Sequence, residues 1–232
     1  MAQHKVNSLD QILFENVSFK AEGLDPVLSG VDLDLPMDQN VIIQSSNPSH
    51  AVHVLEILAG RKEPISGRIK WSDEGAFEEE AAQFNFHEVV GSYFESFRPA
   101  PDMKVSQVLS STGASSEICQ EAIEHFEWDS LRNKKFRDLK YEDQKSILIV
   151  LPTLKLPQML VLEDPASGIS EMKFLNYLDW LQLWQRQGHL RHLFMTNHHP
   201  TAARHMDVCF MHVEEGLIYV DELMPNKKIV HF

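Results

Sequence analysis

The sequence predicts an α/β protein built on a mostly parallel β-sheet that helices cover on both faces. Apolar stretches of strand length alternate with helical spacing along the 232-residue chain, and several of these stretches end in polar residues. The clearest succession of strand, loop and helix lies in residues 40–60. It consists of the apolar run Val41–Ile42–Ile43, the turn-forming residues 45–49, and the helical spacing of Val52, Leu55, Ile57 and Leu58.

The composition fits a single large domain in a reducing compartment. The chain is 43% apolar, which is enough for a full core, and it shows neither an apolar run of about 18 residues nor a signal-peptide core at its N-terminus. Cys119 and Cys209 lie in separate apolar contexts, so we expect buried thiols and a cytoplasmic protein. The net charge of −13 argues against nucleic-acid partners. Because no long apolar run is present, we also expect no direct membrane insertion.

Strands dominate the first part of the chain. Residues 12–20 and 31–35 alternate in polarity and predict an antiparallel pair, with turn signals in residues 23–30 between them. Residues 67–71 predict another short strand, and residues 89–94 predict a strand that enters the core.

Helices and buried strands alternate in the remainder. Residues 95–140 carry short helical patterns broken by Pro99, Pro101 and a serine cluster, as in an inserted helical subdomain. The later elements, in chain order, are a helix at 142–151 that Pro152 ends, a buried strand at 159–162, a long helix at 171–187, and strands at 192–196, 208–213 and 217–220. In such sheets ligands bind beyond the carboxyl ends of the strands, where the loop at 45–51, the pair Glu163–Asp164, and Asn197 fall.

The central stretch has the layout of a P-loop without its chemistry. In a P-loop, backbone N–H groups of a glycine-rich turn and of the helix N-terminus hold phosphates, and a Lys reaches the terminal one. Here the glycine positions hold Ser45, Pro48 and His50, the Lys position holds Ala51, and the magnesium-binding Ser/Thr position holds Val52.

Taken together, these positions resemble the nucleotide-binding (ATPase) subunit of ABC transporters over residues 12–220. The resemblance is carried by ENVSF, PVLSGVDLDLP, LEILAG, PISGRI, MLVLEDPASGIS and LFMTN, in family order and at family distances. It implies a P-loop NTPase-like ABC ATPase fold with an N-terminal antiparallel β-subdomain. It also implies one domain over residues 1–232, with a core formed by 1–94 and 141–232 and a helical subdomain at 95–140.

The functional positions of the family depart from its pattern. Ala21 stands near the adenine-stacking position, with Phe19 close by, and Glu95 stands at the Q-loop Gln. The remaining correspondences are Leu139 to Asp143 with the LSGGQ signature, Glu163 and Asp164 with an inverted Walker B pair, Ser170 with the D-loop Asp, and Asn197 with the switch His. Losing the Lys, the hydroxyl ligand and the glycines together removes most of the means of phosphoryl transfer.

The resemblance with these departures predicts a pseudo-ATPase. We expect no functional catalytic residue at the degenerate positions Asp164, Asn197 and Glu95, no bound metal, and no cofactor, with Glu163 as the remnant Walker B acid. The degenerate Walker A loop, represented by Ser45, Asn47, Ser49, His50, Ala51 and Val52, is at best a weak anion site.

Other interpretations of these residues stay open. Glu163 and Asp164 could hold a metal or could be a hydrogen-bonded strand-end pair, and Ser49 could be only a helix N-cap. Trp180 and Trp184 could belong to the core or to an inter-subunit patch. His50, His53, His198, His199 and His205 could gather near the former nucleotide site as a zinc or pH-sensing cluster, or could be solvated or capping residues.

Two functions follow. The first is a non-hydrolysing structural or regulatory subunit at the cytoplasmic face of a membrane. A permease would dock in a groove formed by residues 93–103, from Tyr93 to Met103, and the chain would pair with a copy of itself or with an active ATPase. The alternative is an atypical ATP-binding subunit that uses ATP and Mg²⁺ and hydrolyses slowly, or only in a composite site.

Overall fold

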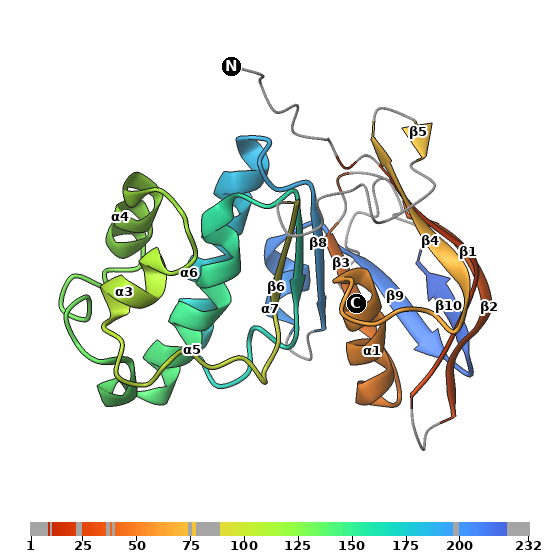
Figure 1. Ribbon diagram of the computed structural model, residues 1–232, viewed down its shortest axis with the longest axis horizontal. Coiled ribbons are helices and arrows are strands. Elements are labelled where there is room, and N and C mark those ends of the chain that lie inside the picture. The colour runs from red at the N-terminus through yellow and green to blue at the C-terminus, as the bar shows by residue number, and fades with distance from the viewer. Residues whose placement is uncertain are drawn as a thin grey trace, which may run out of the picture.

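The protein consists of two β-sheets with a helix between them and further helices on the outer side of the larger sheet (Figure 1). The computed structural model describes residues 9, 11–21, 25–35, 38, 40–73, 76–77, 89–196 and 200–221. Within them, the strand order is β2-β1-β4-β5 in the smaller sheet and β10-β9-β3-β8-β7-β6 in the larger.

The larger sheet is parallel except at one end. Its strands are β3 (Asn40–Gln44), β6 (Val90–Tyr93), β7 (Met159–Leu162), β8 (His192–Thr196), β9 (Cys209–Glu214) and β10 (Leu217–Val220). β3 pairs in parallel with β8 and β9, and β7 pairs in parallel with β6 and β8, whereas β10 returns antiparallel to β9 as a hairpin. The predicted α/β class with a mostly parallel sheet is therefore confirmed.

The central strands are buried on both faces, and alternate residues enter different cores. Ile42, Leu160 and Met195 belong to an apolar cluster with the outer helices. Val41 and Val161 belong to a second cluster, which contains the helix between the sheets. This double burial explains why these strands read as continuous apolar runs rather than alternating ones.

The helix between the sheets is α1 (Pro48–Leu58), which follows the loop after β3. It buries Val54, Leu55, Ile57 and Leu58. The other helical elements, in chain order, are α3 (Val105–Ser110), α4 (Ser116–His125), η1 (Phe136–Asp138), α5 (Tyr141–Val150), η2 (Leu151–Lys155), α6 (Glu171–Arg186) and α7 (Thr201–His205).

The smaller sheet is antiparallel and contains β1 (Gln11–Lys20), β2 (Pro26–Leu35), β4 (Ser66–Asp73) and β5 (Ala76–Phe77). The predicted pairing of the first two strands is confirmed. The prediction of a turn through residue 30 was wrong, because β2 begins at Pro26. Proline is tolerated there because it is the first residue of an edge strand and needs no ladder hydrogen bond.

Residues 95–140 form the short helices α3, α4 and η1, which lie beside α5 and α6 (Figure 1). Val108 and Ile123 from this segment share one apolar cluster with the buried faces of α5 and α6. The division of the chain into core and helical subdomain stays a prediction.

Two further predictions concern α5 and α6. Pro152 lies just after α5, as expected. Trp180 and Trp184 of α6 are buried, which places them in the core.

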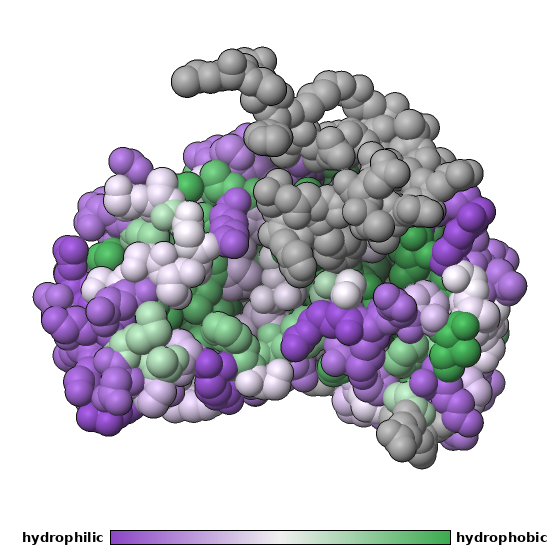
Figure 2. Space-filling model, in the orientation of Figure 1, coloured by the Kyte–Doolittle hydropathy of each residue, from purple (hydrophilic) through white to green (hydrophobic). Residues whose placement is uncertain are grey.

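Hydrophilic residues cover most of the outer margin of the helical part, whereas hydrophobic surface lies toward the middle of the same face (Figure 2). Within the described ranges, no helix combines the length and the hydropathy needed to cross a bilayer.

A glycine near the start of β4 tests the packing of the smaller sheet. Gly67 has φ +76°, and a Cβ there would collide with the backbone carbonyl of Asn16, at the register shift between β1 and β4. Gly113 has φ +80° but open space around it, so it is a matched control. We expect Gly113→Ala to lower the free energy of unfolding by about 1 kcal/mol through backbone strain alone and Gly67→Ala to lower it by about 3 kcal/mol. Urea denaturation of both variants measures the difference, and equal losses would contradict the predicted collision.

Candidate functional site

The loop between β3 and α1 is a helix start rather than an open phosphate cradle. α1 begins at Pro48, whose missing N–H costs nothing at the first helical position. Asn47 is the N-cap, and its Oδ1 accepts from the Ser49 N–H at 3.2 Å and from the Ser49 hydroxyl at 2.7 Å. The interpretation of Ser49 as the N-cap was therefore wrong, because Asn47 occupies that position.

The backbone N–H groups from residue 46 to residue 50 all have acceptors within the chain. The contacts, in order, are Ser46 N to Glu214 Oε1 at 2.6 Å, Asn47 N to Ser45 Oγ at 3.2 Å, Ser49 N to Asn47 Oδ1, and His50 N to Asn47 O at 2.9 Å. Pro48 has no N–H to offer. The N–H groups of Ser46, Asn47, Ser49 and His50 are thus already hydrogen-bonded within the chain.

Glu214 brings a carboxylate against the loop from the end of β9. Its two oxygens accept from the Ser46 N–H at 2.6 Å and from the Ser46 hydroxyl at 2.5 Å. These hydrogen bonds, with smaller contributions from His212 and His50, lower the pKa of the Glu214 carboxyl below its ordinary value. The parallel pairing of β3 with β9 places this side chain beside the loop.

The positions that would hold the phosphate Lys and the magnesium ligand belong to the helix wall. Ala51 is only 4% exposed and lies in the apolar cluster between the sheets. Val52, which follows it in α1, is half-buried. The Nε2 atom of His50 is buried and has no hydrogen-bond partner. Neither Ala51 nor Val52 therefore offers a cationic side chain to an anion.

The acidic pair at the end of β7 is held by hydrogen bonds. Glu163 Oε2 accepts from the backbone N–H of Glu95 at 2.8 Å. The backbone N–H of Asp164 donates to Thr196 Oγ1 at 2.9 Å, and Asp164 has φ +38°. Of the two alternatives for this pair, a metal site or a hydrogen-bonded strand end, the contact of Glu163 matches the hydrogen-bonded strand end.

A buried ammonium group lies beside this pair. Lys145 of α5 is 2% exposed, forms an ion pair with the carboxylate of Glu95, and donates to the Asp164 carbonyl oxygen at 3.0 Å. Its Nζ also lies 4.8 Å from the centre of the Tyr93 ring. The side chain of Glu95 and the main-chain carbonyl of Asp164 therefore meet at a cation of the chain itself, and Glu163 is joined to them through the Glu95 N–H.

The segment at the signature position is tied to the loop before α6. Glu142 accepts from the Ser170 N–H at 2.7 Å, and Lys173 forms ion pairs with both Glu142 and Asp143. The exposed ring of Tyr141 lies against Gly168, where an added Cβ would collide with it.

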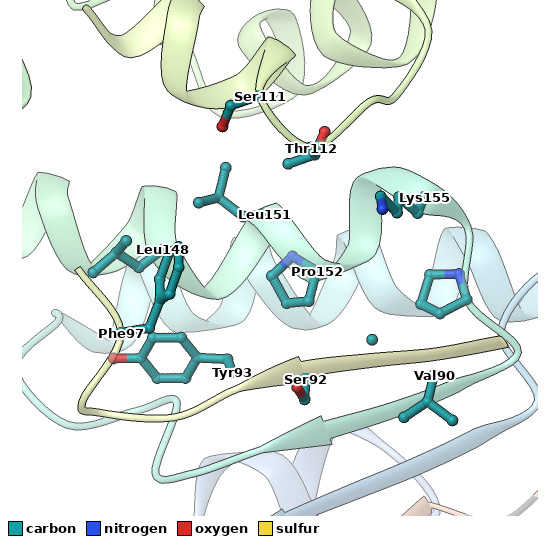
Figure 3. A pocket seen from close by; sticks show the side chains of 12 residues that line it. Val90, Ser92, Tyr93, Phe97, Ser111, Thr112, Leu148, Leu151, Pro152 and Lys155 are labelled. Atoms are coloured by element: carbon teal, nitrogen blue, oxygen red, sulfur yellow. The ribbon is translucent and has the colours of Figure 1, made fainter. Parts of the chain in front are cut away.

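The predicted docking groove coincides in part with a hollow of about 290 Å³ beside β6 (Figure 3). Tyr93 and Phe97 line it from the predicted segment, and Leu148, Leu151 and Pro152 line it from α5 and η2. Figure 3 shows Phe97 standing beside Leu148 and above Tyr93.

Some predicted residues lie outside the described part of the chain, namely Asn197, His198 and His199. The described part contains no group of three or more His, Cys, Asp or Glu residues that could hold a metal ion. His53 contacts Glu56 at 2.8 Å, and His205 contacts Asp179 at 2.8 Å, so these two histidines pair with separate acids.

Sequence reasoning missed Lys145 and Glu214. Lys145 lies one helical turn before the buried residues Leu148 and Ile149, and this spacing could have indicated its burial. Nothing in the sequence around Glu214 marks it, because its contact with Ser46 depends on the pairing of β3 with β9.

The lowered pKa of Glu214 predicts a pH dependence at Ser46. The contact stabilises the folded protein above the ordinary carboxyl value of 4.5 and is lost as the pH falls through the lower folded-state value. We expect the Ser46 amide signal in an NMR titration to shift with a midpoint below 4.5. Glu214→Gln should abolish this shift and Glu215→Gln should preserve it. A titration that survives Glu214→Gln would contradict the contact.

The ion pair between the buried Lys145 and the half-buried Glu95 predicts a difference between two lysines of the same segment. Lys145→Met should lower the free energy of unfolding by about 1–3 kcal/mol, because the Glu95 carboxylate and the Asp164 carbonyl lose their donor. Lys140→Met, at the exposed start of α5, should change it by about 0.5 kcal/mol or less. Chemical denaturation measures both, and a double-mutant cycle with Glu95→Gln isolates the pair. Equal effects of the two Lys→Met substitutions would rule out the predicted role of the ion pair.

Comparisons with known proteins relate the sequence and the fold to those of other chains. No protein-family model matches the chain. It is 21% identical over 216 residues, 89% of its length, to a Bacillus cereus protein named "Putative ABC transporter ATP-binding protein". The matched part is 38% of that protein, so the chain spans about two fifths of the length of this curated relative.

Solved structures match nearly the whole chain. A nucleotide-free ATP-binding cassette from an ABC transporter has a TM-score of 0.71 at 17% identity, covering 90% of each chain. An ATP-binding subunit of an ABC transporter has a TM-score of 0.74 at 16% identity, covering 92% of this chain and 90% of its own. A dimeric cassette bound to ADP and Pi has a TM-score of 0.73 at 16% identity, covering 93% of this chain and all of its own. The chain resembles the ATP-binding proteins of ABC transporters, and it has the fold of their ATP-binding cassettes.

Proposed function

We propose that this chain is a catalytically degenerate ABC-type cassette that acts as a non-hydrolysing structural or regulatory partner of a membrane permease or ABC complex. The fold supports the proposal that the chain is an ABC-type cassette. The loop between β3 and α1 supports the proposal that the cassette is catalytically degenerate, because its backbone N–H groups donate to acceptors of the chain itself instead of being available to phosphate.

The loop contacts carry this proposal. An entering triphosphate would have to displace the Glu214 carboxylate from Ser46 and the Asn47 side chain from Ser49. Ala51 supplies no ammonium to compensate the phosphate charge, and Glu214 adds charge of the same sign. These residues do not fit magnesium–ATP, so we derive no phosphoryl-transfer step for this site.

Lys145 supports the same conclusion at the acidic pair. Its ammonium pairs with Glu95 and with the Asp164 carbonyl, beside the carboxylate of Glu163. A divalent cation brought to the same carboxylates would be repelled by this fixed positive charge. Of the two remnant acids, Glu163 thus serves the backbone of Glu95 through its carboxylate, and Asp164 serves Lys145 through its carbonyl oxygen.

The partner contact follows from the groove beside β6. Tyr93 and Phe97 line it, within the segment where the resemblance places permease docking. The proposed location is the cytoplasmic face of a membrane, in a complex with a permease. A second cassette, either a copy of this chain or an active ATPase, would complete the complex.

The second candidate function is an atypical ATPase, and the retained acids Glu163 and Asp164 favour it. They lie at the carboxyl end of β7, where parallel sheets place their ligand sites. On this alternative, ATP and magnesium bind after Glu214 and Lys145 move away, and hydrolysis depends on Asp164.

Magnesium–ATP binding distinguishes the two functions. Isothermal titration of the purified chain should give no saturable binding up to millimolar ATP, and phosphate release should stay at the level of a protein-free blank. Ala51→Lys should gain no binding, because Pro48, Asn47 and Glu214 still close the loop.

Micromolar binding with a turnover that Asp164→Asn abolishes would overturn the proposal in favour of the atypical ATPase. Asp179→Asn is a suitable control. It removes a carboxylate of α6 that forms an ion pair with His205 of α7, away from the acidic pair. Turnover lost in both variants would point to damage of the fold rather than to a role of Asp164.

A further inference from the structure

The groove beside β6 continues into a second hollow that carries positive charge. A hollow of about 480 Å³ is lined by Arg61, Phe94 and Arg98 and shares Ser92 and Phe97 with the first one. We call the two together the β6 groove. Phe97 stands at their junction and is 49% exposed although it is a large aromatic residue.

The first hollow, of about 290 Å³, has a mixed lining. Its apolar part contains Tyr93, Leu148 and Leu151, and its polar part contains Ser111, Thr112 and Lys155. An exposed aromatic residue beside such a hollow is typical of the residues that dominate binding energy between proteins. The exposed ring of Phe97 therefore favours contact with side chains of a partner protein.

The second hollow presents two guanidinium groups that have no acidic partner in the part of the chain that the structure describes. Arg61 lies over the Phe94 ring, 4.2 Å from its centre. Arg98 Nη1 donates to the carbonyl oxygens of Glu95 and Phe97 at 2.5 and 2.7 Å. Both side chains are held in place without neutralisation of their charge, and a guanidinium has five N–H donors.

The two arginines of the second hollow stand out because the chain as a whole is acidic. Asp and Glu outnumber Lys and Arg by 34 to 21. On such an acidic protein, two fixed arginines without carboxylates complement an anionic partner and repel a cationic one. The docking partner of the β6 groove therefore needs an acidic group next to its apolar side chains.

We infer that the β6 groove binds a protein segment that places apolar side chains between Tyr93 and Leu151 and a carboxylate against Arg61 and Arg98. This inference rests on the proposed function, because it names the chemistry of the segment that the proposed partner would insert. The bound segment would cover Phe97 and pair with both guanidinium groups.

The test is selection of binding peptides from a random twelve-residue display library on the intact chain. Peptides that bind the wild-type protein but not Arg61→Gln/Arg98→Gln should be enriched in Asp or Glu next to Leu, Ile or Phe. Each selected peptide should bind at least tenfold more weakly to the double variant, and a Glu→Gln change in the peptide should produce a similar loss. Arg204→Gln, an exposed arginine on α7, should bind like the wild type.

Charge exchange separates recognition from damage to the fold. Arg61→Glu/Arg98→Glu should lose the acidic peptides and gain affinity for their Glu→Lys counterparts, with circular dichroism unchanged. The inference falls if selected peptides are not acidic, if no peptide distinguishes the double variant from the wild type, or if the groove substitutions instead dissociate a dimer of the chain in sedimentation. Magnesium–ATP titration tests the proposed function separately, since neither arginine contacts the loop at 45–52.

Discussion

Burial of the central strands on both faces is the constraint on which the structure depends. β3, β7 and β8 give alternate side chains to two apolar cores, one with the outer helices and one with α1. Neither face accepts polar groups without a partner, so polar side chains collect where the strands end. The loop at Ser45, the pair Glu163–Asp164 and Thr196 share one edge of the sheet for this reason.

The polar groups at this edge satisfy one another. Glu214 meets the loop, Asn47 caps α1, and Lys145 lies between Glu95 and the Asp164 carbonyl. The chain's own groups thus pair with one another at the strand ends. Pairing offsets part of the cost of burying the Lys145 ammonium, which would be far more destabilising without the Glu95 carboxylate.

Strong local patterns allowed much of the fold to be predicted from the sequence. The strands β7, β8 and β10 have the predicted bounds, because apolar runs of strand length lie between polar or turn residues there. β2 was shortened in the prediction because Pro26 and Gly30 resemble a turn, although an edge strand tolerates both. The assignment of Ala51 to the phosphate Lys position stays a prediction from the sequence. The contacts of Glu214 and Lys145 join residues of distant elements, and local patterns carry no information about them.

Glu95 is anchored from two directions directly after β6. Its backbone N–H is bound to Glu163 of the neighbouring strand end, and its side chain is paired with Lys145 of α5. The segment that carries Phe97 is therefore rigidly attached to both elements and does not act as a hinge. A force applied to Phe97 by a bound partner would therefore be transmitted to the larger sheet and to α5 at the same time. We expect the sheet and α5 to move together as one rigid unit.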